Sequence, residues 1–236
     1  MCTVTYFPLK NKTVLTSNRD EKPYRSAQEI HCEKGIIYPK DAAKSGTWFA
    51  VTENGNAIVL LNGAFKNHQR ETKYRKSRGM IVLDLISTKD VFKSLELIDL
   101  QNIEPFTLVI FQKKELTEFR WDGAEKYFKI LDSNLPYIWS SSTLYNNEAQ
   151  EKRNAIFKEF LEEETINEEK VWDFHYQKTD DLENGITIKR QNTIQTISTT
   201  QLVISDTITL KHQDRLQPNS NLEKFSLQNE HKTSLS

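Results

Sequence analysis

The chain has few cysteines and no long apolar run. Its 236 residues include only two cysteines, Cys2 and Cys32, too few for the disulfide framework that stabilises small secreted domains. No apolar stretch approaches the roughly 18 residues that a transmembrane helix requires. The N-terminus lacks the basic region and apolar segment of a secretory signal. We therefore expect a cytoplasmic protein with no integral membrane segment.

An excess of charge of one sign is also missing. The sequence has 32 basic and 33 acidic residues, a net charge of −1, so nucleic acid and anionic membrane surfaces are not expected partners. The apolar fraction of 37% is low, but 10% aromatic residues and regular strand patterns indicate a folded chain. The length fits a single domain over residues 1–217, and the polar residues 218–236 are expected to form a loose C-terminal tail.

Metal-ligating residues are not grouped in a recognisable pattern. His31 and Cys32 are adjacent, which indicates a metal site only weakly, because two ligands alone do not make a zinc site. We expect no metal and no cofactor.

Cys2 directly follows Met1. Methionine aminopeptidases remove the initiator when the next side chain is small, and the mature chain would then begin with a thiol and a free α-amine on one residue. An α-amine with a pKa of about 8 can take the thiol proton, so an N-terminal Cys is a nucleophile that carries its own general base. Taken alone, Cys2 is better explained as an accident of where translation starts. The residues that follow bear on the choice.

A strand pair follows Cys2. Residues 3–9 are β-branched and aromatic and predict a strand; 10–12 are a polar turn, and 13–17 predict the returning strand. The hairpin brings residues near position 20 beside residue 2. The second strand leads into Asn18-Arg19-Asp20-Glu21, a polar cluster that commonly forms a solvated turn. Beside an N-terminal Cys, Asp20 could instead hold the α-ammonium, and Arg19 could lower the thiol pKa and bind a carboxylate or oxyanion.

These features resemble the NRDE family, the transport-and-Golgi-organisation family named for the tetrapeptide at 18–21. Further segments match family motifs in the family's order: 44–51 (KSGTWFAV), 59–63 (VLLNG), 77–79 (SRG), 105–108 (PFTL), 139–142 (WSSS) and 196–200 (TISTT). Together the matches cover most of residues 1–215.

The resemblance implies an α+β fold, the αββα four-layer sandwich of N-terminal-nucleophile hydrolases, with two antiparallel sheets between helical layers. The chain's own patterns are compatible with it, because they give a sheet, two helices, a sheet, two helices and a sheet in succession. Helices are expected at 75–88, 90–97, 147–163 and 168–175, and later strands at 48–52, 56–61, 106–111, 116–121, 127–131, 186–188, 193–199, 202–205 and 207–210.

Asn62 ends the apolar strand and precedes Gly63. Its side chain could cap the turn, or its amide could stabilise the oxyanion of a tetrahedral intermediate, in a place similar to the oxyanion Asn of choloylglycine hydrolases. The basic residues between 68 and 78 form either a solvated loop or the mouth of a cleft that favours an anionic ligand. The expected catalytic residues are Cys2, Arg19, Asp20 and Asn62, and the expected substrate-binding residues are Asn18, Glu21, Arg25, Ser141 and Arg78.

Two positions depart from the family pattern. Ser141 stands where the family often has Asn, and Ile197 where it often has Arg. Arg19 and Asp20 are adjacent, whereas the corresponding pair in related hydrolases is separated. Neighbouring side chains on a strand face opposite ways, so both approach Cys2 only if the strand has ended before them.

Two functions stay open. The first is an acyl hydrolase that acts on an amide or thioester bond of a small anionic substrate. The second, also implied by the resemblance, is a non-catalytic haem or acyl-CoA binding protein on the same fold. Either function predicts a small-molecule ligand and leaves the oligomeric state open. A plain interaction domain would have no use for an N-terminal Cys.

Overall fold

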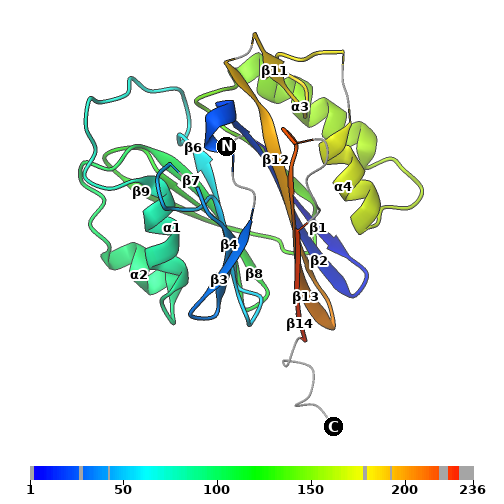
Figure 1. Ribbon diagram of the computed structural model, residues 1–236, viewed down its shortest axis with the longest axis horizontal. Helices are drawn as coiled ribbons and strands as arrows, with labels where there is room; N and C mark the ends of the chain where they lie inside the picture. Colours follow the sequence, from blue (N-terminus) through cyan, green and yellow to red (C-terminus); the bar gives the residue numbers. More distant parts are fainter. Residues whose placement is uncertain are drawn as a thin grey trace.

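Two antiparallel sheets lie face to face in the computed structural model, with a pair of helices on the outer side of each (Figure 1). The structure describes residues 3–26, 29–41, 43–177, 180–191, 193–217 and 223–228. Met1 and Cys2 lie outside the described residues. The arrangement is the αββα sandwich that the family resemblance implied.

The first sheet contains the N-terminal hairpin. Its strands are β1 (Thr3–Leu9), β2 (Lys12–Glu21), β10 (Tyr137–Ser140), β11 (Lys189–Arg190), β12 (Ile194–Ile204), β13 (Thr207–Asp214) and β14 (Glu223–Gln228). The order is β10-β1-β2-β12-β13-β14, and β11 pairs with β12. β1 therefore lies inside the sheet, between β10 and β2, as expected for the strand that follows Cys2.

The second sheet is a meander in sequence order. Its strands are β3 (Ile30–Glu33), β4 (Ile36–Pro39), β5 (Phe49–Thr52), β6 (Ala57–Asn62), β7 (Phe106–Gln112), β8 (Glu115–Trp121) and β9 (Lys126–Leu131). Gly55 has a φ of +76° in the turn between β5 and β6, the left-handed conformation that the Asn-Gly pair predicts there.

The helices cover the outer faces. α1 (Arg78–Ile86) and α2 (Val91–Leu97) lie on the second sheet, α3 (Asn147–Phe160) and α4 (Glu168–Tyr176) lie on the first, and a short 3-10 turn, η1 (Pro23–Arg25), follows β2 (Figure 1). Asp90 caps α2 by accepting from the Lys93 amide, one of the two caps that the sequence suggested.

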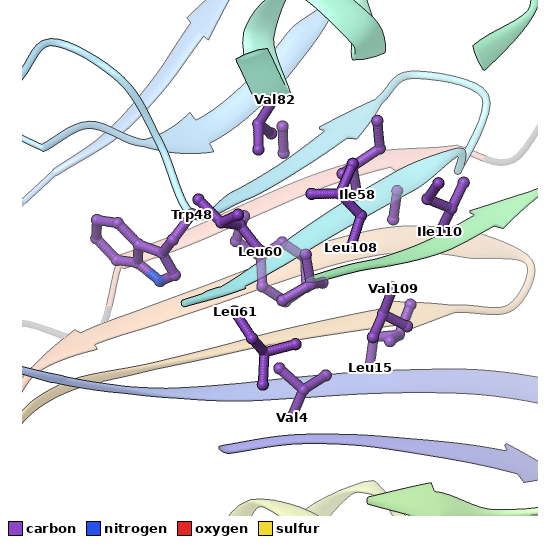
Figure 2. Packing of buried hydrophobic residues seen from close by; sticks show 14 of the residues in the cluster. Val4, Leu15, Trp48, Ile58, Leu60, Leu61, Val82, Leu108, Val109 and Ile110 are labelled. Carbon is purple, nitrogen blue, oxygen red and sulfur yellow. The ribbon is translucent and has the colours of Figure 1, made fainter. Parts of the chain in front are cut away.

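The main core fills the space between the sheets. Figure 2 shows Val4 and Leu15 of the first sheet pointing toward Leu61 and Val109 of the second, with Val82 of α1 on the far side of that sheet. A smaller apolar cluster joins β1 and β2 to the outer helices and contains Phe7, Val14, Phe157, Phe160 and Phe174. Both faces of the first sheet are therefore buried, which holds the ends of its central strands in place.

Several elements differ from the sequence prediction. The hairpin of β3 and β4 and the strand β10 were not expected, and the expected strand at 186–188 is not a strand. The segments 193–199 and 202–205 form one strand, β12, because β2 and β13 both pair with it through residues 200 and 201. The buried Gln201 side chain donates to Thr16 and to the Glu168 carbonyl. Within the expected loose tail, residues 223–228 form β14 and pair with β13.

His175 on α4 gives the fold a pH dependence. Its side chain is fully buried, and its Nε2 lies 2.8 Å from Thr5 Oγ1. Burial, with Arg153 and Arg215 nearby, lowers the His175 pKa from 6.5 to about 3. The unfolded chain therefore binds a proton at a pH where the folded chain does not, so this contribution to stability is complete above about pH 6.5 and declines as the pH falls toward 3.

We expect the free energy of unfolding, measured by urea denaturation, to fall between pH 7 and pH 5 by up to about 1.4 kcal/mol per pH unit from this residue. His175→Gln should flatten that slope, whereas His31→Gln, on the edge hairpin, should leave it unchanged. Equal slopes in the wild type and in His175→Gln would show that another group controls the acid response.

Candidate active site

The NRDE residues lie within β2 and are not a turn. β2 continues to Glu21 because β12 pairs with it from Thr13 to Glu21 and supplies backbone hydrogen bonds along that length. The expectation of a strand that ends before residue 18 is therefore wrong. Side chains alternate along a strand, so Arg19 faces the second sheet with Leu15, and Asp20 faces the outer helices with Asn18.

Arg19 is a buried cation between the sheets. It is 2% exposed, its Nη2 donates to Asp41 Oδ2 at 2.7 Å, and its guanidinium lies 3.8 Å from the ring centroid of Trp48. Burial lowers the pKa of Arg19 to about 10, and the nearby Asp41 carboxylate opposes that shift. Among the described residues, Nη1 has no hydrogen-bond partner. An unsatisfied buried donor is rare, and this one is available for a ligand.

Arg25 and Glu21 extend the same network. Arg25 on η1 forms ion pairs with Glu21 and with Asp41, so the Asp41 carboxylate bridges two guanidiniums. The three predicted residues Arg19, Glu21 and Arg25 are thus brought together on one face. Asp41 was not predicted, and its position outside any matched motif gave no signal.

These residues line a cavity of about 380 Å³, which we call the cationic cavity. Its basic residues are Arg19, Arg25, Lys44, Arg70, Lys73, Lys76 and Arg78, and its acidic residues are Glu21, Asp41, Glu71 and Glu104. The lining therefore carries a net charge of +3. Of the basic run between 68 and 78, Arg70, Lys73, Lys76 and Arg78 line this cavity, whereas His68 and Arg75 do not. Most of the run therefore lies where the cleft-mouth interpretation predicted.

Asn62, the last residue of β6, also lines the cationic cavity. No described residue forms a hydrogen bond with its side-chain amide, which leaves both amide N–H groups available. The Asn62 backbone carbonyl accepts from Ser141 Oγ at 2.8 Å. Ser141 is 1% exposed and is not among the cavity residues, so its hydroxyl holds the end of β6 and does not face the cavity where substrate was expected.

Two glycines, Gly46 and Gly79, allow Arg78 to reach the cationic cavity. A Cβ on Gly79 would lie 2.8 Å from the Thr47 carbonyl oxygen, and one on Gly46 would lie 2.6 Å from the Gly79 carbonyl carbon. Only glycines allow the first turn of α1 to approach the segment before β5 so closely. Arg78 then pairs with Glu104 at 3.1 Å and donates to the Pro105 carbonyl. Burial lowers its pKa to about 10, and Glu104 opposes the shift.

Asp20 and Asn18 belong to a different environment. Asp20 accepts from the Tyr145 hydroxyl at 2.9 Å and from Thr196 Oγ1 at 2.5 Å. Asn18 donates to the carbonyls of His175 and Ile186 and accepts from Thr199. The Asn18 side chain thus links β2 to the outer layer by hydrogen bonds. It does not line the cationic cavity.

Cys2 precedes Thr3, the first described residue of β1. Thr3 is paired with Asn18 of β2 and with Ser140 of β10. The next residues along those two neighbours are Arg19 and Ser141, so these two residues lie at the strand ends beside Thr3. Contacts of Cys2 with Arg19, Asp20 and Asn62 lie outside the described residues and stay predictions.

A family model for Transport and Golgi organisation 2 matches residues 1–235. The chain belongs to that family. None of the curated protein sequences matches it.

Several solved structures share the fold of this family member. A Caenorhabditis elegans N-acylethanolamine-hydrolyzing acid amidase ortholog is 10% identical, with a TM-score of 0.60 over 93% of this chain and 95% of that one. An arginine-to-leucine variant of conjugated bile acid hydrolase from Clostridium perfringens is 9% identical, with a TM-score of 0.56 over 96% and 92%. Penicillin V acylase from Agrobacterium tumefaciens is 10% identical, with a TM-score of 0.52 over 97% and 86%. All three have the N-terminal-nucleophile hydrolase fold, and at these identities the likeness shows the fold alone.

The second departure from the Transport and Golgi organisation pattern lies on β12. Ile197 is fully buried, at a bulge between Thr196 and Ser198 where the register with β2 shifts. An apolar side chain there packs into the interior and supplies no hydrogen-bond donor.

Cys32 is free and exposed, and the described part of the chain holds no group of three or more His, Cys, Asp or Glu suited to a metal ion. None of its described helices is long and apolar enough to cross a bilayer.

Proposed function

We propose that this protein is an N-terminal cysteine acyl hydrolase that acts on an amide or thioester bond of a small anionic substrate. One observation carries the proposal. The strand that follows Cys2 begins beside a cationic cavity in which Arg19 keeps an unpaired buried N–H and Asn62 keeps an amide that no described residue pairs with. Acyl transfer uses a nucleophile and an oxyanion donor, and a nearby cation favours the thiolate form of the nucleophile.

The mechanism begins with removal of Met1, which frees the α-amine of Cys2. The amine takes the thiol proton, and the positive charge of Arg19 favours the thiolate. The thiolate sulfur attacks the substrate carbonyl carbon, and Asn62 donates to the resulting oxyanion. The tetrahedral intermediate expels the amine or thiol leaving group, which takes the proton from the α-ammonium. Water, deprotonated by the α-amine, then attacks the acyl-enzyme and releases the carboxylic acid and the Cys2 thiol.

The preference for an anionic substrate rests on donors as well as on charge. Arg19 Nη1, Arg25 Nε, Trp48 Nε1 and Ser77 Oγ are buried, lack a partner among the described residues, and belong to residues that line the cationic cavity. Buried donors without acceptors cost about 1–3 kcal/mol each. A carboxylate or phosphate supplies acceptors and negative charge together, and so fits this lining better than a neutral group does.

Intact mass spectrometry with an acyl donor tests the proposal. We expect protein purified from a normal cytosol to lack Met1 and to gain an acyl mass from S-phenyl monothiosuccinate faster than from neutral S-phenyl thiobutyrate. A peptide with the sequence of residues 2–9 controls for the intrinsic reactivity of any N-terminal Cys with thioesters.

If the folded protein were acylated no faster than the peptide, the proposal of an acyl hydrolase would be wrong. A homogeneous protein that retains Met1 and is nevertheless fully active would also contradict it, because such a protein has no Cys2 amine to act as base.

A non-catalytic carrier of haem or acyl-CoA is the second candidate. It is favoured by the loss of two donors, because Ser141 is engaged with the Asn62 carbonyl and Ile197 is apolar. A carrier needs the cationic cavity but not the thiol. This alternative would be selected if the wild-type protein hydrolysed no substrate and the Cys2→Ala variant bound haem or acyl-CoA with wild-type affinity.

A further inference from the structure

A second concavity lies near the same strand ends, and we call it the carboxamide cavity. Its volume is about 730 Å³, within the range of about 300–1,000 Å³ typical of small-molecule sites. Three distant parts of the chain form it: the loop at 65–67 after β6, the segment at 142–150 that includes the first turn of α3, and residues 183, 184 and 190 before β12.

The lining of this cavity is neutral and rich in amides. It contains five carboxamide side chains: Asn67, Asn146, Asn147, Gln150 and Asn184. Its charges balance, because Lys66 and Arg190 are matched by Glu148 and Glu183, and Arg190 lies 3.6 Å from Glu183. The carboxamide cavity therefore gives a charged ligand none of the advantage that the cationic cavity gives an anion.

Three of the five amides are held by one hydrogen bond that leaves the other half of the group available. The carbonyl oxygens of Asn146 and Asn67 accept from the backbone N–H groups of Ala149 and His68, which leaves their NH₂ groups. Gln150 donates to the Tyr145 carbonyl, which leaves its own carbonyl.

For Asn147 and Asn184, no described residue hydrogen-bonds the side-chain amide. The cavity lining thus offers both donors and acceptors, some of them already fixed in orientation.

The position of the cavity connects it to the site beside Thr3. Tyr145 lines the cavity and donates to Asp20, while Ser142, another lining residue, directly follows the Ser141 that holds the Asn62 carbonyl. We propose that the carboxamide cavity binds an uncharged, amide-bearing part of a small-molecule ligand, through paired N–H and C=O contacts with these side chains. The proposal goes beyond acyl hydrolysis, because it applies equally if the protein only carries its ligand.

A matched pair of probes tests it on the full-length protein. N,N′-diacetylethylenediamine carries two amides, and ethylene glycol diacetate has nearly the same shape but no N–H donor. In ¹H–¹⁵N spectra we expect the diamide to shift the side-chain NH₂ signals of the five carboxamides saturably. The diester should shift these signals at least about fivefold less at equal concentration, because each lost hydrogen bond weakens binding. Sodium succinate should leave these signals in place and shift the Trp48 indole signal in the cationic cavity.

Variants locate the effect. Asn147→Asp keeps the shape and suits the first turn of a helix, and together with Asn184→Leu it should weaken diamide binding at least about fivefold. Asn54→Leu, in the turn at the other end of β6, should have no effect. Equal shifts from diamide and diester, or undiminished diamide binding in the Asn147→Asp, Asn184→Leu double variant, would overturn the proposal. Failure of the succinate arm alone would count against the anionic substrate and leave the carboxamide cavity standing.

Discussion

Cys2→Ala is expected to abolish acyl transfer to the protein, and with it all turnover of thioester and amide substrates. The alanine side chain has no nucleophile, and none of the described residues that line the cationic cavity carries a thiol. Cys2→Ser should retain only a small fraction of the activity, because a hydroxyl at neutral pH is a far weaker nucleophile than a thiolate. The rate of acyl-enzyme formation, followed by intact mass, measures both changes.

Cys32→Ala is the matched control. Cys32 is the second cysteine of the chain and is exposed on β3, so its loss should leave acylation unchanged. If Cys2→Ala retained hydrolysis at the wild-type rate, the assignment of the nucleophile would be wrong. If acylation disappeared only with Cys32→Ala, the labelling would report an exposed thiol and no active site.

Asn62→Ala is expected to lower kcat by about 10²–10³, the loss that follows removal of one oxyanion donor. The effect should fall on kcat more than on KM, because the donor stabilises charge that develops only in the transition state. The fold should tolerate the change. Ser141 binds the Asn62 backbone carbonyl and not its side chain, so alanine retains the contact that holds the end of β6.

Asn54→Ala provides the comparison for Asn62→Ala at the opposite end of β6, where the turn lies far along the strand from the cationic cavity. It should change neither kcat nor KM. A loss of less than about threefold in Asn62→Ala, with thermal stability unchanged, would mean that Asn62 caps the strand end and that backbone N–H groups alone serve the oxyanion.

The two layers of sheet follow from local patterns. β1, β2 and the strands from β5 to β9 each carry a short apolar or alternating run bounded by polar turns, and α1 to α4 each carry a helical period. Such patterns depend on which side chains a segment must bury, so the sequence specifies them almost without reference to the rest of the chain. The sequence motifs also led to a real cluster, because Arg19, Glu21, Arg25, Asn62 and Arg78 all line the cationic cavity.

Local sequence patterns alone do not specify which face of the sheet a residue occupies or where a strand ends. Residues 18–21 look like a turn because they are polar, yet pairing with the distant β12 extends β2 through them. That pairing satisfies the backbone, sends Arg19 to the cationic cavity, and places Asp20 against Tyr145 on the opposite face. A different pairing, with β13, forms β14 within a segment whose composition predicted a loose tail.

What the sequence determined by itself, then, is the succession of strands and helices, the family motifs and the chemical types gathered near the N-terminal strand. The tertiary structure decided their partners. Asp41 neutralises part of the charge of Arg19 and Arg25, Glu104 pairs with Arg78, and Ser141 is held by a backbone carbonyl. These contacts join residues that are distant in the chain, and local propensity carries no information about them. They form because buried charges and hydrogen-bonding groups require partners, and only the packed sheets determine which partners are within reach.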